Sequence, residues 1–460
     1  MRIADLIGRR VAVWGFGREG RAALHALREG CGEQRLTLFC SEAEVDAVRA
    51  FDPALEIVAG EPDAATLSSF DVVVKSPGIS AYKQALLAAR EQGTQITSGT
   101  ALWFGENPDA RVVAVTGTKG KSTTSALLAH LARALGVRTA LAGNIGLPLL
   151  ELRGQQADLW VVELSSFQTG EAGPVELGVV TSLYEEHLDW HGSRERYVAD
   201  KLRLADASRQ LLVNALQPAL LEHTQAYPQR LLFGQPEGWH VADGFIRRGE
   251  REVFAVADLA VPGLHNALNA CAALATLEIL GMDASAAVPA LATFQPLPHR
   301  LQPLGRREDF DWIDDSISTT PLATLAALES LHGRTATVLV GGHDRGLDWS
   351  PFVQAMQQAP AHAIVCMGAN GERIGAALRQ AGVASMLLRA DKLAEAVELA
   401  RSNTPADGVI LLSPGAPSFD QFRDYAERGR CFAELAGFDS AALGGIQGLG
   451  IVDKKPSPAA

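Results

Sequence analysis

The residues of this chain best suited to chemistry form a short run of glycine, lysine and hydroxyl side chains, Gly117-Thr118-Lys119-Gly120-Lys121-Ser122-Thr123. This run follows the apolar segment 111–115 and precedes an apolar-periodic stretch, so we expect it between a buried strand and a helix. Backbone N–H groups of such a loop converge on phosphate oxygens, and the helix N-terminus adds partial positive charge. We expect Lys121 to reach the β- and γ-phosphates and Ser122 or Thr123 to bind Mg²⁺.

The spacing of this loop is shorter than in the common phosphate loop, whose first glycine lies five residues before the second. Val115 occupies that position here. A glycine-rich turn without a ligand is the alternative interpretation. The predicted strand–loop–helix setting and the Lys-Ser-Thr ending both disfavour it.

A second glycine loop, Gly15-Phe16-Gly17-Arg18-Glu19-Gly20, follows the apolar run 10–14. Its spacing is typical of dinucleotide binding, which also requires an acidic residue after the next strand, where Ser41 and Glu42 lie. We favour a nucleotide diphosphate over NAD as its ligand, and a turn that only serves packing is the alternative. A nicotinamide-dependent oxidoreductase would leave the 117–123 loop unexplained.

The elements that must position these loops indicate an α/β fold. At roughly 150 residues per domain, 460 residues suggest about three domains. Apolar strand-like runs alternate with helical stretches throughout, at 10–14, 36–39, 71–74, 111–115, 159–163, 178–181, 335–340, 363–367 and 408–412. We predict a Rossmann-like domain at 1–93, a central P-loop ATPase-like domain with a mainly parallel sheet at 94–298, a Rossmann-like C-terminal domain at 299–446, and a mobile tail at 447–460.

The composition excludes several classes of protein. A formal net charge of -12 disfavours non-specific nucleic-acid binding, which rests on neutralising phosphates. The five cysteines are scattered without a CxxC pair, which disfavours a zinc site or disulfide framework. No window of about 18 apolar residues predicts a membrane span, and the N-terminus has no signal-peptide layout. We therefore expect a cytoplasmic protein without nucleic-acid partners or membrane insertion.

Further motifs follow the phosphate loop in a fixed order along almost the whole chain. They are Gly143-Asn144-Ile145-Gly146, Glu163-Leu164-Ser165-Ser166-Phe167-Gln168, Glu186-His187-Leu188-Asp189, Gly263–Ala270, Pro298-His299-Arg300, Asp314-Asp315-Ser316 and Leu412–Gly415. With these motifs the chain resembles the muramyl (Mur) ligases. The Glu163–Gln168 motif and Ser76-Pro77-Gly78 are similar to the MurD branch, which adds glutamate to UDP-N-acetylmuramoyl-L-alanine.

The resemblance implies three domains that bind UDP-sugar, ATP and the incoming amino acid. It implies an ATP-dependent ligase of peptidoglycan precursor synthesis, which phosphorylates a carboxylate to an acyl phosphate that an amine then attacks. Because the reacting groups are all negatively charged, Mg²⁺ and lysine are needed to stabilise them. We expect two Mg²⁺ ions, ATP as co-substrate, small-molecule partners only, and a monomer.

The resemblance also implies residue roles. Catalytic residues would be Lys121, Lys201 and His187, and metal ligands Ser122, Glu163, His187 and carbamylated Lys201. ATP contacts would be Gly117, Thr118, Lys119, Gly120, Lys121, Ser122, Thr123, Asn266, Asn269, Arg300 at the γ-phosphate and Asp315 at the ribose. UDP-sugar contacts would be Gly15, Phe16, Gly17, Arg18, Ser76, Pro77, Gly78, Asn144, Ser165 and Gln168. Glutamate contacts would be Thr319, Arg345, Ser418 and Tyr425.

Each assignment has a simpler alternative. His187 would otherwise be a buried, hydrogen-bonded histidine, and Glu163 an ordinary charge at the end of a strand. Lys201 would otherwise be a solvated lysine on a helix surface. His191, His240 and His332 belong to no recognisable constellation, and we expect them to be structural or exposed.

The glutamate side departs from the usual pattern of the branch. Ile317 stands where the family commonly has lysine, Arg345 lies in a His-Asp-Arg-Gly segment in place of Asp-Gly-Lys, and Tyr425 replaces phenylalanine. Arginine offers a planar fork where lysine offers a point charge. Since the ATP motifs are intact, we hypothesise that the chain adds L-glutamate, with D-glutamate as the standard alternative. A non-catalytic nucleotide-binding regulator and a folylpolyglutamate synthetase are more distant alternatives.

Overall fold

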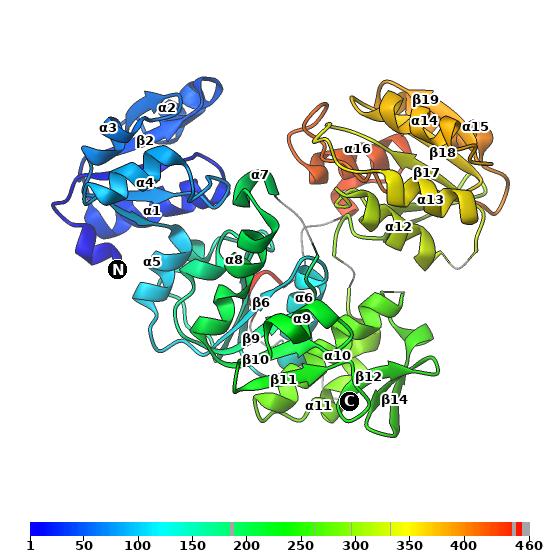
Figure 1. The fold of residues 1–460 in the computed structure, drawn as a ribbon, viewed down its shortest axis with the longest axis horizontal. Helices are drawn as coiled ribbons and strands as arrows, with labels where there is room; N and C mark the ends of the chain where they lie inside the picture. Colours follow the sequence, from blue (N-terminus) through cyan, green and yellow to red (C-terminus); the bar gives the residue numbers. More distant parts are fainter. Residues whose placement is uncertain (185–187, 262, 296, 332, 444–447, 453–460) are drawn as a thin grey trace. The chain divides into compact units, whose positions relative to one another are not determined.

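The computed structural model describes residues 1–184, 188–261, 263–295, 297–331, 333–443 and 448–452 (Figure 1). Internal contacts divide the chain into two compact units. The first comprises Met1–Leu259, Leu264–Phe294 and Gly448–Ala460. The second comprises Ala260–Gly263 and Gln295–Gln447.

The first unit opens with a five-stranded parallel sheet in the order β3-β2-β1-β4-β5. Its strands are β1 (Val11–Trp14), β2 (Leu36–Cys40), β3 (Glu56–Ala59), β4 (Val72–Lys75) and β5 (Gln95–Thr97). Successive residues of β1 face opposite sides, so Val11 and Val13 pack with α1 (Arg18–Cys31), whereas Ala12 and Trp14 pack with residues of α3 (Ala64–Ser68) and α4 (Gln84–Glu91). Strand β5 continues this sheet past residue 93, and the domain limits stay a prediction.

A second sheet of seven strands follows, in the order β11-β10-β9-β6-β8-β7-β21. Its strands are β6 (Val112–Thr116), β7 (Thr139–Gly143), β8 (Leu159–Glu163), β9 (Val175–Val180), β10 (Ser208–Asn214), β11 (Arg230–Phe233) and β21 (Gly450–Val452). All pairs are parallel except β21 with β7. Strands β6 and β8 are buried over their whole length, as expected for central strands of a parallel sheet covered on both faces.

The helices of the first unit hold the two sheets together. They are α1, α2 (Val45–Phe51), α3, α4, α5 (Gly99–Glu106), α6 (Lys121–Ala134), α7 (Leu188–His191), α8 (Arg194–Ala207), α9 (Pro218–His223), α10 (Leu264–Ile279) and α11 (Ala284–Ala287). Leu102, Trp103 and Phe104 of α5 belong to one hydrophobic cluster with residues of β1 and β8. This continuous core explains why the first and second sheets form a single unit. A small antiparallel sheet, β12 (Trp239–Ala242), β13 (Phe245–Arg248) and β14 (Arg251–Ala255), was not predicted.

The second unit is built on a six-stranded sheet in the order β15-β16-β20-β17-β18-β19. Its strands are β15 (Gln302–Arg307), β16 (Phe310–Asp314), β17 (Ala336–Val340), β18 (Ala363–Met367), β19 (Met386–Ala390) and β20 (Val409–Leu412), and only β15 is antiparallel to its neighbour. Two hydrophobic clusters lie on its two faces, one with α12 (Pro321–Ser330), α13 (Ser350–Gln358) and α14 (Gly371–Gln380), the other with α15 (Leu393–Asn403) and α16 (Tyr425–Leu435) (Figure 1).

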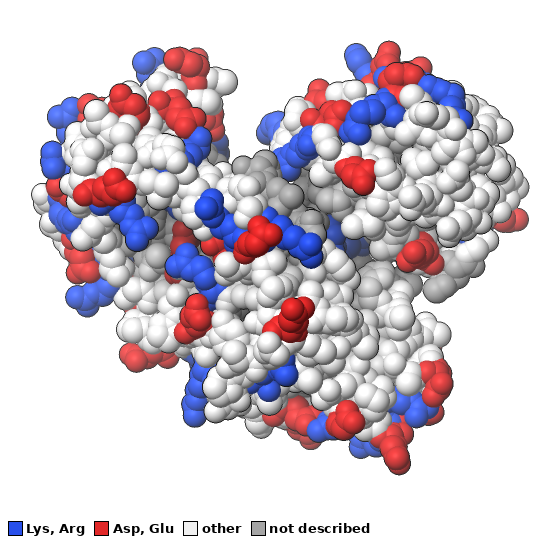
Figure 2. All heavy atoms as spheres, in the orientation of Figure 1, with Lys and Arg blue, Asp and Glu red and all other residues white. Residues whose placement is uncertain are grey.

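The predicted α/β fold with parallel sheets is confirmed in all three large sheets. Figure 2 shows both signs of charge scattered over the visible face of each unit, without one continuous basic patch. Among the described residues, no helix combines the length and apolarity that crossing a bilayer requires.

The expected mobile tail is wrong for residues 450–452. This segment forms β21 at the edge of the second sheet, where Gly450, Ile451 and Val452 pair with Leu141, Ala140 and Thr139. The guanidinium of Arg133 donates to the carbonyl oxygens of both Gly450 (2.9 Å) and Thr139 (2.7 Å). A strand of three residues carries too little pattern to be recognised when its partner lies about 300 residues away in sequence.

We predict that Ile451→Asp destabilises the first unit, whereas Val452→Asp does not. Ile451 packs against the main hydrophobic cluster, while Val452 is 42% exposed. Burying a carboxylate at Ile451 should cost about 1–2 kcal/mol, visible as a lower midpoint of thermal unfolding. Equal midpoints for the two variants would show that β21 does not pack on the sheet in solution.

Candidate functional site

The phosphate loop lies at the carboxyl end of β6 and has a shape that only glycine permits at two positions. Gly117 has φ 144° and Gly120 has φ 85°. A Cβ atom would lie 2.1 Å from the hydroxyl oxygen of Thr181 at the first, and 2.5 Å from the side-chain oxygen of Asn269 at the second. The loop is therefore pressed against the segment after β9 and against α10.

Hydrogen bonds fix the backbone of this loop. Thr118 N–H donates to the carbonyl of Ser182 (2.9 Å), and Lys119 N–H donates to the hydroxyl of Ser182 (2.8 Å). The ammonium of Lys121 donates to the carbonyl of Thr118 (3.1 Å), so it lies over the loop at the start of α6. A cation and a helix N-terminus thus meet at one place, which is the arrangement that phosphate groups require. Ser122 and Thr123 occupy the first turn of the same helix.

Two asparagines of α10 lie against the phosphate loop. Thr124 donates to the side-chain oxygen of Asn269 (3.3 Å), and the amide of Asn269 donates to that of Asn266 (3.3 Å). Both asparagines are buried. The structure therefore brings these two predicted nucleotide contacts to the phosphate loop.

Glu163 ends β8 with a carboxylate that is only half satisfied. Its side chain is 1% exposed, and one oxygen accepts a hydrogen bond from the amide of Asn144 (2.7 Å). The other oxygen, Oε2, is buried and has no hydrogen-bond partner among the described residues. A buried carboxylate oxygen without a donor is costly, and a bound cation would compensate it. Glu163 therefore fits the predicted role of metal ligand.

Lys201 differs from an ordinary surface lysine. It lies on α8 with 2% of its surface exposed, and its ammonium is 4.9 Å from the centre of the Tyr197 ring. The hydroxyl of Tyr197 lies 2.7 Å from that of Thr118, so the helix that carries Lys201 contacts the phosphate loop. The burial removes the alternative of a solvated lysine.

The remaining predicted metal ligand, His187, lies outside the described residues. Within the described ranges no three His, Cys, Asp or Glu side chains gather as a metal-binding group. The expectation of two Mg²⁺ ions stays a prediction.

The first glycine loop connects β1 to α1. A Cβ atom at Gly20 would lie 1.9 Å from the carbonyl oxygen of Gly15, whereas one at Gly17 would meet nothing within 4 Å. Gly15 has φ 100°, and a Cβ there would lie 2.8 Å from the hydroxyl oxygen of Ser76. This loop and Ser76-Pro77-Gly78 are therefore adjacent, and Gly17 is the position open to a ligand.

Two side chains of this loop have different surroundings. Phe16 is 2% exposed and packs edge-on against Phe51, so only its backbone could contact a ligand. Arg18 is exposed, and its guanidinium donates to the carbonyl of Gly146 (3.2 Å) in the turn that holds Asn144. Arg18 thus links the UDP-sugar candidates of the first sheet to those of the second.

Ser165 and Gln168 bind each other. The carboxamide oxygen of Gln168 accepts hydrogen bonds from the hydroxyl (2.8 Å) and N–H (3.2 Å) of Ser165, and its nitrogen donates to the hydroxyl of Thr100 (3.1 Å). Gln168 is 1% exposed. Both groups of its carboxamide already have protein partners, so Gln168 shapes the loop after β8.

In the second unit, Asp315 is buried at the end of β16. Its carboxylate accepts hydrogen bonds from the hydroxyls of Ser318 (2.5 Å) and Ser413 (2.7 Å) and from the N–H of Leu301 (3.1 Å). Burial raises the pKa of Asp315 to about 6, while these bonds and the charge of Arg300 act in the opposite direction. Arg300 Nε is buried without a hydrogen-bond partner among the described residues, which suits an anion contact.

Residues predicted for glutamate binding partly meet in this unit. Arg345 is exposed, and its guanidinium lies 5.7 Å from the ring centre of Phe419, the neighbour of Ser418. The hydroxyl of Ser418 is buried without a partner among the described residues. The carbonyl of Tyr425 accepts a hydrogen bond from Ser316 (2.7 Å). Among the described residues, the half-buried Thr319 makes no hydrogen bond or ring contact with the other three.

Sequence reasoning missed the buried Arg428. Its guanidinium donates to Ser316 and to the carbonyl of Ala416 (3.0 Å), which joins the loops after β16 and β20. Its pKa is lowered to about 10 by burial. An arginine within a helix rich in charged residues gave no signal of this role.

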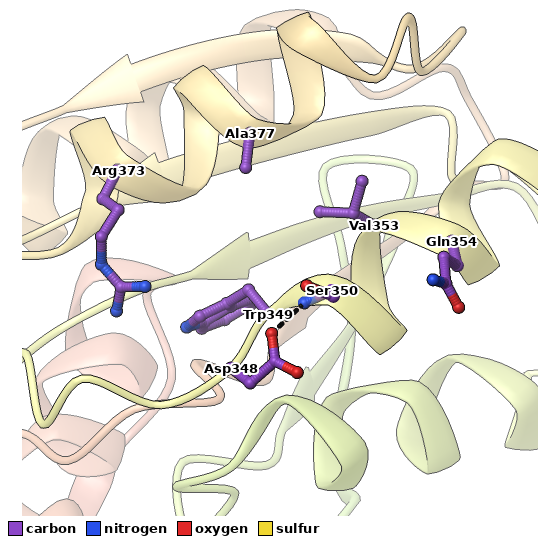
Figure 3. A pocket seen from close by; sticks show the side chains of 7 residues that line it. All are labelled: Asp348, Trp349, Ser350, Val353, Gln354, Arg373 and Ala377. Carbon is purple, nitrogen blue, oxygen red and sulfur yellow. Dashed lines mark hydrogen bonds between the residues drawn. The ribbon is translucent and has the colours of Figure 1, made fainter.

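A hollow of about 350 Å³ on the second unit lies between α13 and α14 (Figure 3). Its lining consists of Asp348, Trp349, Ser350, Val353, Gln354, Arg373 and Ala377. None of the predicted site residues contributes to it. The candidate site consists instead of loops at the carboxyl ends of parallel strands, the usual location in such sheets.

The sequence matches two family models, the Mur ligase middle domain over residues 115–277 and the Mur ligase glutamate ligase domain over residues 299–415. The chain belongs to the Mur ligase family. It is 50% identical to the UDP-N-acetylmuramoyl-L-alanine–L-glutamate ligase of Xanthomonas oryzae over 98% of this chain and 100% of that protein. The ligase of the same name from Micromonospora is 40% identical over 94% of this chain and 98% of its own.

Solved structures share the fold. The UDP-N-acetylmuramate-alanine ligase MurC from Thermotoga maritima aligns with a TM-score of 0.60 at 20% identity, over 93% of this chain and 99% of that chain. The MurF ligase from the same organism, in complex with ADP, aligns with a TM-score of 0.56 at 16% identity, over 96% of each chain.

We predict that Gly20→Ala destabilises the protein by more than about 2 kcal/mol, because the added methyl group would collide with the backbone oxygen of Gly15. Gly17→Ala is the matched control and should shift stability by no more than about 1 kcal/mol. Thermal unfolding followed by circular dichroism measures both. A Gly20→Ala variant as stable as Gly17→Ala would contradict the close approach of β1 and α1.

Proposed function

We propose that this chain is an ATP-dependent ligase that joins L-glutamate to the carboxyl group of UDP-N-acetylmuramoyl-L-alanine through an acyl phosphate. The observation that carries the proposal is that the phosphate loop with Lys121 and the half-satisfied carboxylate of Glu163 lie at the carboxyl ends of the adjacent strands β6 and β8. The names of relatives at 50% identity supply the substrates. These names specify L-glutamate, and Ile317 and Arg345 depart from the usual pattern of the branch. The two observations together favour L-glutamate over D-glutamate.

The chain's own residues would gather the reacting groups. Lys121 and the N–H groups of the loop would bind the phosphates of ATP, and Arg18 with Gly17 would bind the diphosphate of the sugar nucleotide. Asn144, fixed by its bond to Glu163, would face the muramoyl side. Transfer of the γ-phosphoryl group gives the carboxylate a leaving group, and the glutamate amine then displaces phosphate.

Mg²⁺ fits the residues present and would be held by Ser122 and Glu163, with His187 and Lys201 as the proposed ligands of a second ion. When bound, it would neutralise the charge on the transferred phosphoryl group. Lys201 would act as a carbamate, which forms when its neutral amine bonds to CO₂ and releases a proton. Two observations support this role: Lys201 is buried, and its helix α8 contacts the phosphate loop through Tyr197 and Thr118.

In the second unit, Arg300 and Asp315 would contact the γ-phosphate and ribose of ATP. Arg345, stacked on Phe419, would present a two-pronged cation to a glutamate carboxylate, and the Ser418 hydroxyl would serve another carboxylate oxygen. We also propose the three-domain division given above, with β5 added to the first domain and residues 450–452 taken out of the tail. A monomeric state and a role in peptidoglycan precursor synthesis complete the proposal.

Phosphate release measured with ATP, Mg²⁺, UDP-N-acetylmuramoyl-L-alanine and either glutamate enantiomer tests the proposal. We expect kcat/KM for L-glutamate to exceed that for D-glutamate by at least about 100-fold, which corresponds to roughly 2.7 kcal/mol of discrimination. Exclusive turnover of D-glutamate would refute the enantiomer assignment. Absence of phosphate release with both would refute the ligase assignment.

Removal of the metal-facing charge gives a second test. Glu163→Gln keeps an oxygen that can accept from Asn144 but loses the negative charge, so the Mg²⁺ concentration for half-maximal activity should rise by about 10-fold or more. The control is Glu176→Gln, which should leave this concentration unchanged. Glu176 lies at the start of β9, two strands away from β8 in the same sheet, and pairs with Arg111. An unaltered Mg²⁺ dependence in Glu163→Gln would exclude Glu163 as a metal ligand.

A further inference from the structure

A hydrogen-bond network connects the loop after β8 to the loop after β4. The hydroxyl of Ser166 lies 2.9 Å from Nε2 of His191, and Nδ1 of His191 lies 2.7 Å from one carboxylate oxygen of Asp200. The hydroxyl of Tyr82 donates to the other oxygen of Asp200 (2.6 Å). If Nδ1–H donates to the carboxylate, Nε2 accepts from Ser166, and all four residues are satisfied.

The central residues of this hydrogen-bond network are buried. His191 is 0% exposed, Ser166 5% and Asp200 7%. Hydrogen bonds in such surroundings are strong and costly to break, because no water replaces a lost partner. The constellation corrects the expectation that His191 belongs to none. Its members lie 25, 9 and 118 residues apart in sequence, which concealed it.

The segment around His191 is also attached directly to the loop after β4. The indole N–H of Trp190 donates to the carbonyl of Pro77 (3.2 Å), and the hydroxyl of Ser80 donates to the carbonyl of Trp190 (2.8 Å). The rings of Tyr82 and Trp190 meet edge to face, with centres 5.7 Å apart. Helix α7 is therefore attached to the loop that contains Ser76-Pro77-Gly78.

The other end of this hydrogen-bond network lies close in sequence to two predicted metal ligands, Lys201 and Glu163. Asp200 precedes Lys201 on α8, and Ser166 lies three residues after Glu163. Tyr197 on the same helix contacts the phosphate loop through Thr118. The position of α8 is thus set from two sides, by the phosphate loop and by the loop after β4.

We propose that Tyr82 and His191 are positioning residues that couple binding of the sugar nucleotide at the 76–82 loop to the placement of Lys201 and Glu163. The sugar nucleotide would fix the loop, Tyr82 would hold Asp200, and His191 would tie α8 to the segment after Glu163. By linkage, Mg²⁺ and the sugar nucleotide then strengthen each other's binding by the same factor. This inference rests on the proposed function, because the proposed function assigns the sugar nucleotide and Mg²⁺ to the two ends of the hydrogen-bond network.

Calorimetric titration of UDP-N-acetylmuramoyl-L-alanine into the full-length protein with ADP, with and without Mg²⁺, tests the coupling. We expect wild-type protein to bind about 5-fold more tightly or better with Mg²⁺, and Tyr82→Phe to reduce this ratio below about 2-fold. The phenylalanine keeps the ring contact with Trp190 and removes only the hydroxyl bond to Asp200.

Tyr227→Phe is the matched control. Tyr227 also donates to an aspartate of α8, Asp206, at 3.4 Å on an exposed part of the helix. This variant should keep the wild-type ratio and the wild-type kcat. Ser80→Ala removes one hydrogen bond to Trp190 and should also lower the affinity ratio. This variant replaces Tyr82→Phe in the test if Tyr82→Phe folds poorly.

Three results would overturn the coupling: a wild-type ratio near 1, an unchanged ratio in both Tyr82→Phe and Ser80→Ala, or an equal loss in Tyr227→Phe. Phosphate release by wild-type protein is measured on the same preparation. Turnover together with a ratio near 1 would refute the coupling alone, whereas absent turnover with both glutamate enantiomers would refute the proposed function itself.

Discussion

The buried carboxylate of Glu163 imposes the main physical constraint on this molecule. One of its oxygens is bound by Asn144, and the other is enclosed without a donor among the described residues. A buried carboxylate oxygen without a donor raises the free energy of the folded protein. A cation bound beside it would lower that free energy. The phosphate loop beside it supplies a lysine and a helix N-terminus, which attract anions to the same edge of the sheet.

The elements around Glu163 and the phosphate loop hold the polar groups of the site in fixed positions. Asn269 packs closely on Gly120, where φ is 85° and a Cβ atom would lie 2.5 Å from the Asn269 side-chain oxygen. Tyr197 holds α8 to the phosphate loop, and Arg18 joins the loop after β1 to the turn after β7. Preorganised polar groups of this kind need little rearrangement when charge develops, which is the main source of electrostatic stabilisation in enzymes.

Much of this could be predicted from local patterns. The apolar runs before Gly15 and Gly117 identified the strands β1 and β6, and the glycine spacing identified both loops. Short or mixed strands such as β3 and β5 lack a clear period and were missed. Contacts that depend on the tertiary fold, such as the burial of Lys201, the partners of His191 and the pairing of β21, join residues far apart in sequence and leave no local pattern.

The return of β21 to the second sheet makes the C-terminal unit an insertion within the first unit rather than an appendage at its end. Apart from the short segment Ala260–Gly263, the backbone enters the second unit between residues 294 and 295 and leaves it between residues 447 and 448. A single proteolytic nick in either connection would leave the halves attached.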